Sequence, residues 1–311
     1  MPFQLNQLTS AQLDELPREK TVFFFSIGPI EDHGPHLPLG LDIEESTRLS
    51  CLAAQRLENE KPGWYGILLP AIPLGVDSNT TRVAMTVRPY VIRDYLVDVC
   101  QSFIKQGFFH FVCFSGHLGP RQLTAVEEAG ILIRKSARLK RLGSFAIGRF
   151  QNTTPTLVSA SSSLVQNEEV RRSPLWPDPK EHAGARDTSM ALVVTPDLVK
   201  PSYQSLPPLA RPQSKWLRDL ERRSGRVQGY WGNPAEATLE KGEAQLKEAL
   251  DRVFPKLNAV WGGANPRNTF RSWYGVFPPN KSFFKAWILA LLFFTFICLW
   301  LAMSLQGLNL D

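Results

Sequence analysis

The sequence SIGPIEDHGPHLPLGLDIEE spans residues 26 to 45 and continues an apolar run, TVFFFSI, that begins at Thr21. That run is rich in β-branched and aromatic residues and is followed by Gly-Pro, so it predicts a buried strand over residues 21–27. Glu31 and His33 lie two residues apart, and in an extended chain their side chains point to the same side. Asp42 follows a loop rich in Pro and Gly. A carboxylate, an imidazole and a second carboxylate beyond a buried strand favour a divalent-metal site.

The same residues allow a structural interpretation. His33 and His36 could be loop histidines that bond to the backbone. Asp42 stands at the start of a helical pattern, and with Glu45 it forms a possible capping box. The two roles of Asp42 are compatible, because a carboxylate has one oxygen for a cap and another for a metal.

Residues 31–42, EDHGPHLPLGLD, resemble the signature of the creatininase (creatinine amidohydrolase) family, E-x-H-G-P-H-L-P followed by Asp. Members of that family are metal-dependent hydrolases that act mostly on unusual C–N amide bonds. The resemblance implies that Glu31 and His33 each bind one divalent ion and that Asp42 bridges the two.

A second motif follows the apolar run 108–114 and reads SGHLGP over residues 115–120. It resembles the family's N-G-H-G-G-N, which implies that His117 is a metal ligand. The sequence departs from the motif at Ser115 and Pro120. Creatininase itself has a ligating glutamate two residues after this histidine, where this chain has Gly119. From the residues alone, His117 could instead be a strand-end histidine bonded to backbone.

A third motif, EHAGARDTS over residues 181–189, resembles the family's H-A-G-x-x-E-T-S. The resemblance implies that His182 is a catalytic acid or base near the metals. Asp187 occupies the place of the family glutamate, so it is a candidate both for catalysis and as a metal ligand. The residues also allow a plain loop histidine at 182 and a helix N-cap at Asp187.

Strands that alternate with helices predict an α/β domain, a three-layer sandwich with a largely parallel central sheet. In such sheets the ligand site lies beyond the carboxyl ends of the strands. The segments MTVRP (85–89) and GNPAEATLEKGEAQ (232–245) extend the resemblance to about residues 15–255. We expect a creatininase-like domain over residues 1–260. Within it, 144–150 is predicted as a strand, and 151–180 as a loop that forms a lid or a subunit contact in a homo-oligomer.

Composition narrows the class of protein. The chain has 311 residues, of which 43% are hydrophobic, and a net charge of +6. Its basic residues are scattered and not interleaved with aromatic ones, so we expect no nucleic-acid partner. Residues 1–20 are polar, and we expect no signal peptide. The cysteines show no CxxC spacing and are predicted to be reduced thiols: Cys51, Cys100, Cys113 and Cys298.

The C-terminal part of the sequence differs from the rest. Residues 286–305 read AWILALLFFTFICLWLAMSL and carry no charge, while Lys281 and Lys285 precede them. This pattern predicts a transmembrane helix at 286–305, a linker at 261–285, and a single-pass membrane protein with its catalytic domain in the cytoplasm. The alternative is a buried helix.

Together these observations and the resemblance predict a membrane-tethered amidohydrolase. Two divalent ions (Zn, Mn or Fe) would activate water to cleave an amide bond of a small molecule or modified peptide. One alternative is a catalytically weak scaffold or binding protein that keeps the fold. A phosphoester hydrolase is another, although the sequence has no Walker-type loop to bind phosphate.

Overall fold

The centre of the molecule is a parallel sheet. In this computed structural model, which describes residues 2–76, 83–143, 154–165, 181–211, 214, 228–272 and 281–307, the strand order is β1-β4-β2-β6-β7. All pairs in this sheet are parallel. The strands are β1 (Phe3–Gln4), β2 (Thr21–Ile27), β4 (Tyr65–Leu68), β6 (His110–Ser115) and β7 (Thr156–Ser159). The predicted parallel α/β fold and the strand over residues 21–27 are confirmed.

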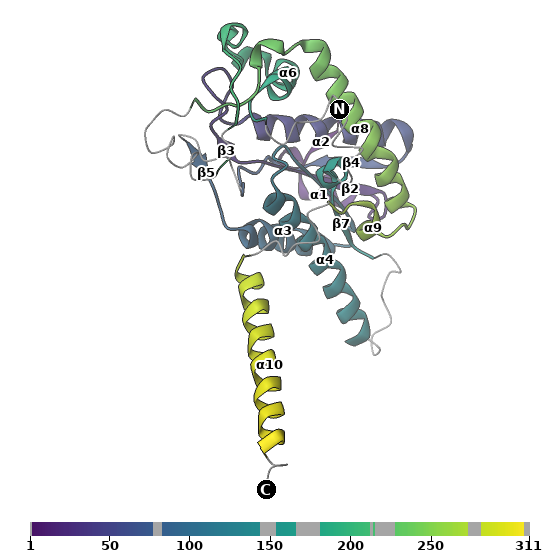
Figure 1. The fold of residues 1–311 in the computed structure, drawn as a ribbon. Helices are drawn as coiled ribbons and strands as arrows, with labels where there is room; N and C mark the ends of the chain where they lie inside the picture. Colours follow the sequence, from purple (N-terminus) through teal and green to yellow (C-terminus); the bar gives the residue numbers. More distant parts are fainter. Residues whose placement is uncertain are drawn as a thin grey trace.

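The sheet lies between two helical layers because its central strand is apolar on both faces. Val22 and Phe24 pack into a core with α2 (Leu41–Glu60), α6 (Ala185–Val194) and α8 (Leu239–Trp261). Phe23 and Phe25 pack on the opposite face. There they meet α3 (Pro89–Ile104) and α4 (Pro120–Gly143) (Figure 1). Such two-sided burial is typical of parallel sheets.

The carboxyl ends of β2 and β6 bring the first two motifs together. Ile27 is in register with Ser115, the last residue of β6. Beyond β2 the chain forms the short strand β3 (Ile30–Glu31), which pairs antiparallel with β5 (Ala84–Met85). The Glu31 motif and the His117 motif therefore leave the sheet at neighbouring points.

Two glycines let the chain approach the start of α2. A Cβ placed on Gly116 would lie 2.0 Å from the backbone oxygen of Asp42, and one placed on Gly28 would lie 2.8 Å from the Cβ of Asp42. No larger residue fits at either position unless the backbone moves. The glycines of the first two motifs thus place Asp42 against the ends of β2 and β6.

The helix starts differ from the predicted caps. Gly40 is the N-cap of α2 and makes no side-chain cap bond, so Asp42 lies in the first turn and the predicted capping box with Glu45 is wrong. Likewise Gly184 is the N-cap of α6, and Asp187 lies in its first turn. Both carboxylates are therefore available for other contacts.

Part of the predicted 151–180 loop belongs to the core. Residues 156–159 form β7, and Ala160–Val165 form a buried 3-10 helix. The hydroxyl of Ser161 accepts from the backbone N–H of Ser115 at 2.9 Å and donates to the Ser115 carbonyl at 2.8 Å. The prediction of a lid or subunit contact is wrong for residues 156–165, because they continue the sheet. The predicted strand 144–150 lies outside the described residues.

The predicted linker 261–285 is partly folded onto the domain. It contains α9 (Pro266–Thr269), followed by Phe270, which is buried. The backbone N–H of Ser272 donates to Oε1 of Glu127 on α4 at 2.8 Å. Residues 266–272 therefore anchor the chain to the helical layer.

The last helix, α10 (Lys281–Gly307), extends away from the layers (Figure 1). Within the described part of the chain, no helix combines the length and apolarity needed to cross a membrane. The structure therefore gives no support to the predicted transmembrane helix over 286–305 or to the predicted single-pass membrane location with a cytoplasmic catalytic domain.

Candidate metal centre

Three side chains meet where β3, the β6–α4 loop and the first turn of α2 converge. Glu31, Asp42 and His117 each offer one ligand atom, and these atoms lie within 4.8 Å of one another. Nδ1 of His117 is 3.1 Å from Oε1 of Glu31 and 3.7 Å from Oδ2 of Asp42. All three side chains are buried or nearly so. Two carboxylates and an imidazole in this arrangement are a ligand set for a divalent ion.

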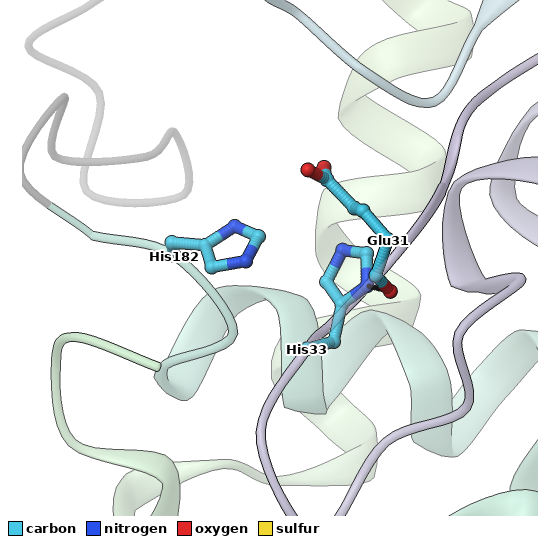
Figure 2. Close-up of side chains that lie close together, drawn as sticks. All are labelled: Glu31, His33 and His182. Atoms are coloured by element: carbon cyan, nitrogen blue, oxygen red, sulfur yellow. Dashed lines mark hydrogen bonds between the residues drawn. The ribbon is translucent and has the colours of Figure 1, made fainter. Parts of the chain in front are cut away.

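A second cluster shares Glu31 with the first. Its ligand atoms come from Glu31, His33 and His182, again within 4.8 Å of one another. Figure 2 shows the imidazole rings of His33 and His182 facing one another, with the Glu31 carboxylate beside them. The two ring centroids are 4.8 Å apart. The structure therefore brings four of the predicted site residues to Glu31: His33, Asp42, His117 and His182.

Backbone carbonyls set the orientation of both imidazoles. Nδ1 of His33 bonds to the carbonyl of Glu31 at 3.0 Å, and Nε2 of His182 bonds to the carbonyl of Asp32 at 2.9 Å. A carbonyl only accepts, so these nitrogens carry the hydrogen. The other nitrogen of each ring, Nε2 of His33 and Nδ1 of His182, then has a lone pair. Metal-binding histidines commonly have this arrangement.

Asp42 lies between two histidines. Its Oδ2 faces Nδ1 of His117 at 3.7 Å, and its Oδ1 faces Nε2 of His33 at 3.8 Å. The carboxylate thus presents one oxygen toward each histidine, whereas Glu31 is the residue that belongs to both clusters.

The burial of the Glu31 and Asp42 carboxylates shows whether the site suits a cation. Both carboxylate oxygens of Glu31 and Oδ2 of Asp42 are buried without a hydrogen-bond partner among the described residues. The contact of Glu31 Oε1 with His117 Nδ1, at 3.1 Å, is an ion-pair distance. Buried carboxylates without donors are costly, and a divalent ion would remove that cost. The donor set therefore fits a metal.

The acidities of the two carboxyls are linked. Burial raises the pKa of Glu31, but His117 outweighs it and brings the pKa down to about 2. Burial and the neighbouring Glu31 charge raise the pKa of Asp42 well above its ordinary value. Two adjacent buried carboxyls resist ionising together, and a bound cation is what would keep both charged.

The family model described as creatinine amidohydrolase matches residues 6–257, which is most of the chain. The chain belongs to the creatininase family. It is a hydrolase of that family, whose members act on C–N bonds of non-peptide or modified-peptide substrates. The predicted resemblance is thus confirmed.

Similar proteins include one curated relative and several solved creatininase structures. The chain is 26% identical over 267 residues to the mycofactocin precursor peptide peptidase of Mycobacterium ulcerans (strain Agy99), covering 83% of this chain and 92% of that protein. The structure named Creatininase Mn matches with a TM-score of 0.60 at 17% identity, covering 84% of this chain and 99% of that one. A putative creatinine amidohydrolase from Bacteroides fragilis NCTC 9343 matches with a TM-score of 0.59 at 19% identity, with 84% and 97% covered. At these identities the structures show a shared fold.

Asp187, at the family's glutamate position, lies outside both clusters of the described residues. Its Oδ2 accepts from the backbone N–H of Ala183 at 2.6 Å, and its Oδ1 accepts from Nη1 of Arg186 at 2.6 Å. Burial raises the pKa of Asp187, but Arg186 and then His182 outweigh it, so the pKa is lowered. The carboxylate is charged and its oxygens are both engaged by its own turn.

Several neighbours of this creatininase-family site were not found by sequence reasoning. The backbone of Trp231 exchanges two hydrogen bonds with that of His182, at 2.7 and 3.0 Å, and their rings lie 5.8 Å apart. Trp231 directly precedes the GNP motif at residue 232, and that position was the only sign in the sequence that it lies near the site. His36, for which a bond to backbone was one interpretation, instead bonds through Nε2 to the side-chain Oγ1 of Thr188 at 2.9 Å, and burial lowers its pKa to about 4.

Proposed function

We propose that this protein hydrolyses a C–N amide bond of a small molecule or a modified peptide at a two-ion centre. Glu31, His33, Asp42 and His117 would hold the ions. The observation that carries the proposal is the convergence of these four side chains, with buried carboxylate oxygens that lack hydrogen-bond partners in the described part of the chain and with His182 beside them. Imidazole and carboxylate ligands suit Zn, Mn or Fe.

A bound divalent pair supplies a hydroxide near neutral pH and polarises the amide carbonyl. The protein's own residues orient and move the proton. His182 is held by the Asp32 carbonyl at Nε2, so its Nδ1 can take a proton from the attacking water and pass it to the leaving nitrogen. Burial lowers the pKa of His182, with His33 adding to the effect, and this favours the neutral imidazole, the form that can accept a proton.

The substrate class is an amide other than an ordinary peptide bond. The peptide peptidase of Mycobacterium ulcerans, at 26% identity, supports a modified peptide as one candidate. Creatininase structures, which share only the fold, support a small cyclic or linear amide as the other.

A binding protein without activity was the alternative suggested by Ser115 and Pro120, where the chain departs from its family motif. The intact clusters argue against it. Ser115 also has a structural explanation, because its hydroxyl donates to the His117 carbonyl at 2.7 Å and so shapes the ligand loop.

An amidase screen of the full chain tests the proposal. The protein would be stripped with chelator, reloaded with Mn or Zn, and offered cyclic amides, linear amides and short peptides with modified ends. We expect metal-dependent release of an amine that His182→Ala abolishes. A loaded protein that holds two ions yet releases no amine from any of these classes contradicts the proposed function.

A further inference from the structure

Ala183 has an unusual backbone conformation beside the proposed acid–base residue. Its φ is +51°, and among the described residues no other non-glycine residue has a positive φ. Residues with a Cβ avoid this left-handed region, so surrounding contacts must hold such a residue there. Ala183 is fully buried and lies between His182 and the N-cap of α6.

The Asp187 carboxylate supplies that contact. Its Oδ2 accepts the backbone N–H of Ala183 at 2.6 Å, which closes a turn over residues 183–187. Its Oδ1 is held by Arg186 at 2.6 Å. The carboxylate is therefore fixed at both oxygens, one by the backbone that it restrains and one by a partly buried cation.

Arg186 connects this turn to the helix that carries a proposed ligand. Its guanidinium lies 4.0 Å from Oε2 of Glu45, which is buried on α2 one turn beyond Asp42. Its backbone N–H donates to Oε1 of Glu181 at 3.1 Å. The residues on both sides of His182 thus belong to one partly buried network of charges.

The turn decides where the His182 ring points. At His182 the chain forms an antiparallel bridge with Trp231, whereas α6 begins at Ala185. The left-handed residue makes the change of direction between the two. With the His182 backbone fixed on one side by Trp231 and on the other by the turn, the imidazole meets both the Asp32 carbonyl and the His33 ring.

We propose that Asp187, held by Arg186, is a positioning residue that locks Ala183 in the left-handed conformation and so directs His182 at the metal centre. It acts through the backbone and binds no ion. This role of Asp187 extends the proposed function. It rests on that function only for the measurement of activity.

The decisive experiment compares Asp187→Ala with the double variant Asp187→Ala/Ala183→Gly. We expect Asp187→Ala to keep both ions by elemental analysis and to lose roughly 10- to 100-fold in kcat with little change in KM, the range seen when supporting partners of site residues are removed. Glycine adopts positive φ freely, so Ala183→Gly should recover most of that loss. Asp187→Asn keeps an acceptor for the Ala183 N–H and should lose less.

A matched control is Asp187→Ala/Ala185→Gly, which adds a glycine two residues on, inside α6, and should recover nothing. A readout that needs no substrate is the ¹H–¹⁵N correlation of the His182 ring in metal-loaded protein. That signal should shift in Asp187→Ala and return in the double variant.

Loss of an ion in Asp187→Ala would make it a ligand and overturn the proposal. Equal turnover in Asp187→Ala and the wild type would overturn it too, as would a double variant no better than Asp187→Ala or its Ala185→Gly control. If the wild type itself has no activity, the proposed function fails, whereas the metal content and the His182 ring signal still decide the role of Asp187.

Discussion

Nδ1 of His117 lies 3.1 Å from Oε1 of Glu31, although the two residues leave the sheet from different strands. The distance is short because β2 and β6 are neighbours in register up to Ile27 and Ser115. Both side chains are buried against Asp42, and the three together form the first cluster.

The two clusters predict different metal losses for different ligands. We expect His33→Ala and His117→Ala each to retain one ion per chain, because each histidine belongs to one cluster. Asp42 belongs to the His117 cluster, but its other oxygen faces His33 at 3.8 Å, so we expect it to bridge and Asp42→Ala to retain neither ion. Elemental analysis after gel filtration measures this. His110→Gln is the control, because His110 is at the opposite end of β6. Two retained ions in Asp42→Ala would contradict the bridging role.

Replacing His182 should separate metal binding from turnover. His182→Ala is expected to keep the fold and both ions, because Glu31, Asp42, His33 and His117 remain. Its kcat should fall by roughly 10²- to 10⁴-fold, the usual contribution of general acid–base catalysis. Parallel metal analysis and kinetics measure both effects. If an ion leaves with the imidazole, His182 is a ligand and not the proton carrier.

Gly116→Ala should damage the site through the backbone. Its Cβ would meet the Asp42 carbonyl at 2.0 Å, so α2 or the β6 end must move. We expect a loss of about 1–3 kcal/mol in the free energy of unfolding, the usual cost of overpacking, together with weaker metal binding. Gly262→Ala is the control, because a Cβ there meets only ordinary contacts at 3.4 Å. Equal unfolding curves for the two variants would show that α2 or the end of β6 moves without a measurable loss of stability.

Acid should destabilise the fold through His110. Burial lowers its pKa from 6.5 to about 4, so the folded state binds this proton less readily than the unfolded state. Stability therefore falls as the pH drops from 6.5 toward 4, by up to about 3 kcal/mol for this residue. Urea unfolding of wild type and His110→Gln at several pH values measures the difference. Identical pH slopes for the two proteins would exclude His110 as the source.

The anchor at residues 266–272 predicts where the chain can be shortened. A chain ending at Ser272 keeps Phe270 and the bond to Glu127, and should hold its metals and its Tm. A chain ending at residue 264 loses the buried Phe270 and should unfold at a lower temperature. Thermal unfolding compares the two. An unchanged Tm in the shorter chain would mean that the anchor adds nothing to stability.

The oligomeric state remains a prediction. We expect a homo-oligomer, and light scattering of the full chain in mild detergent tests it. A monomer across the concentration range would contradict the expectation.

The sequence was most informative where local pattern and motif agree. The apolar run at 21–27 predicted β2 at its observed bounds, and the motifs located five residues that meet at the centre. The cap assignments at Asp42 and Asp187 failed because they compare only near neighbours. Asp42 and Glu45 have capping-box spacing, yet the close approach of Gly116 and Gly28 places the helix start at Gly40.

Long-range contacts explain the other differences. The serines between residues 159 and 163 are polar and were therefore predicted as part of a loop. Inside the fold their hydroxyls form hydrogen bonds, as Ser161 does with Ser115. The pairing of Trp231 with His182 joins segments far apart in the chain and leaves no periodic signal. The apolar run at 286–305 did form a helix, α10, without showing a membrane span among the described residues.

The packing of Gly28 and Gly116 against Asp42 also bears on how the family can diversify. A ligand placed by contact between main chains depends little on the side chains around it. Residues that line the approach to the ions can then be exchanged freely, while the metal geometry stays the same. One fold could in this way acquire new substrates through substitutions around the entrance to the site. A protein engineer could change the substrate specificity without altering the metal ligands.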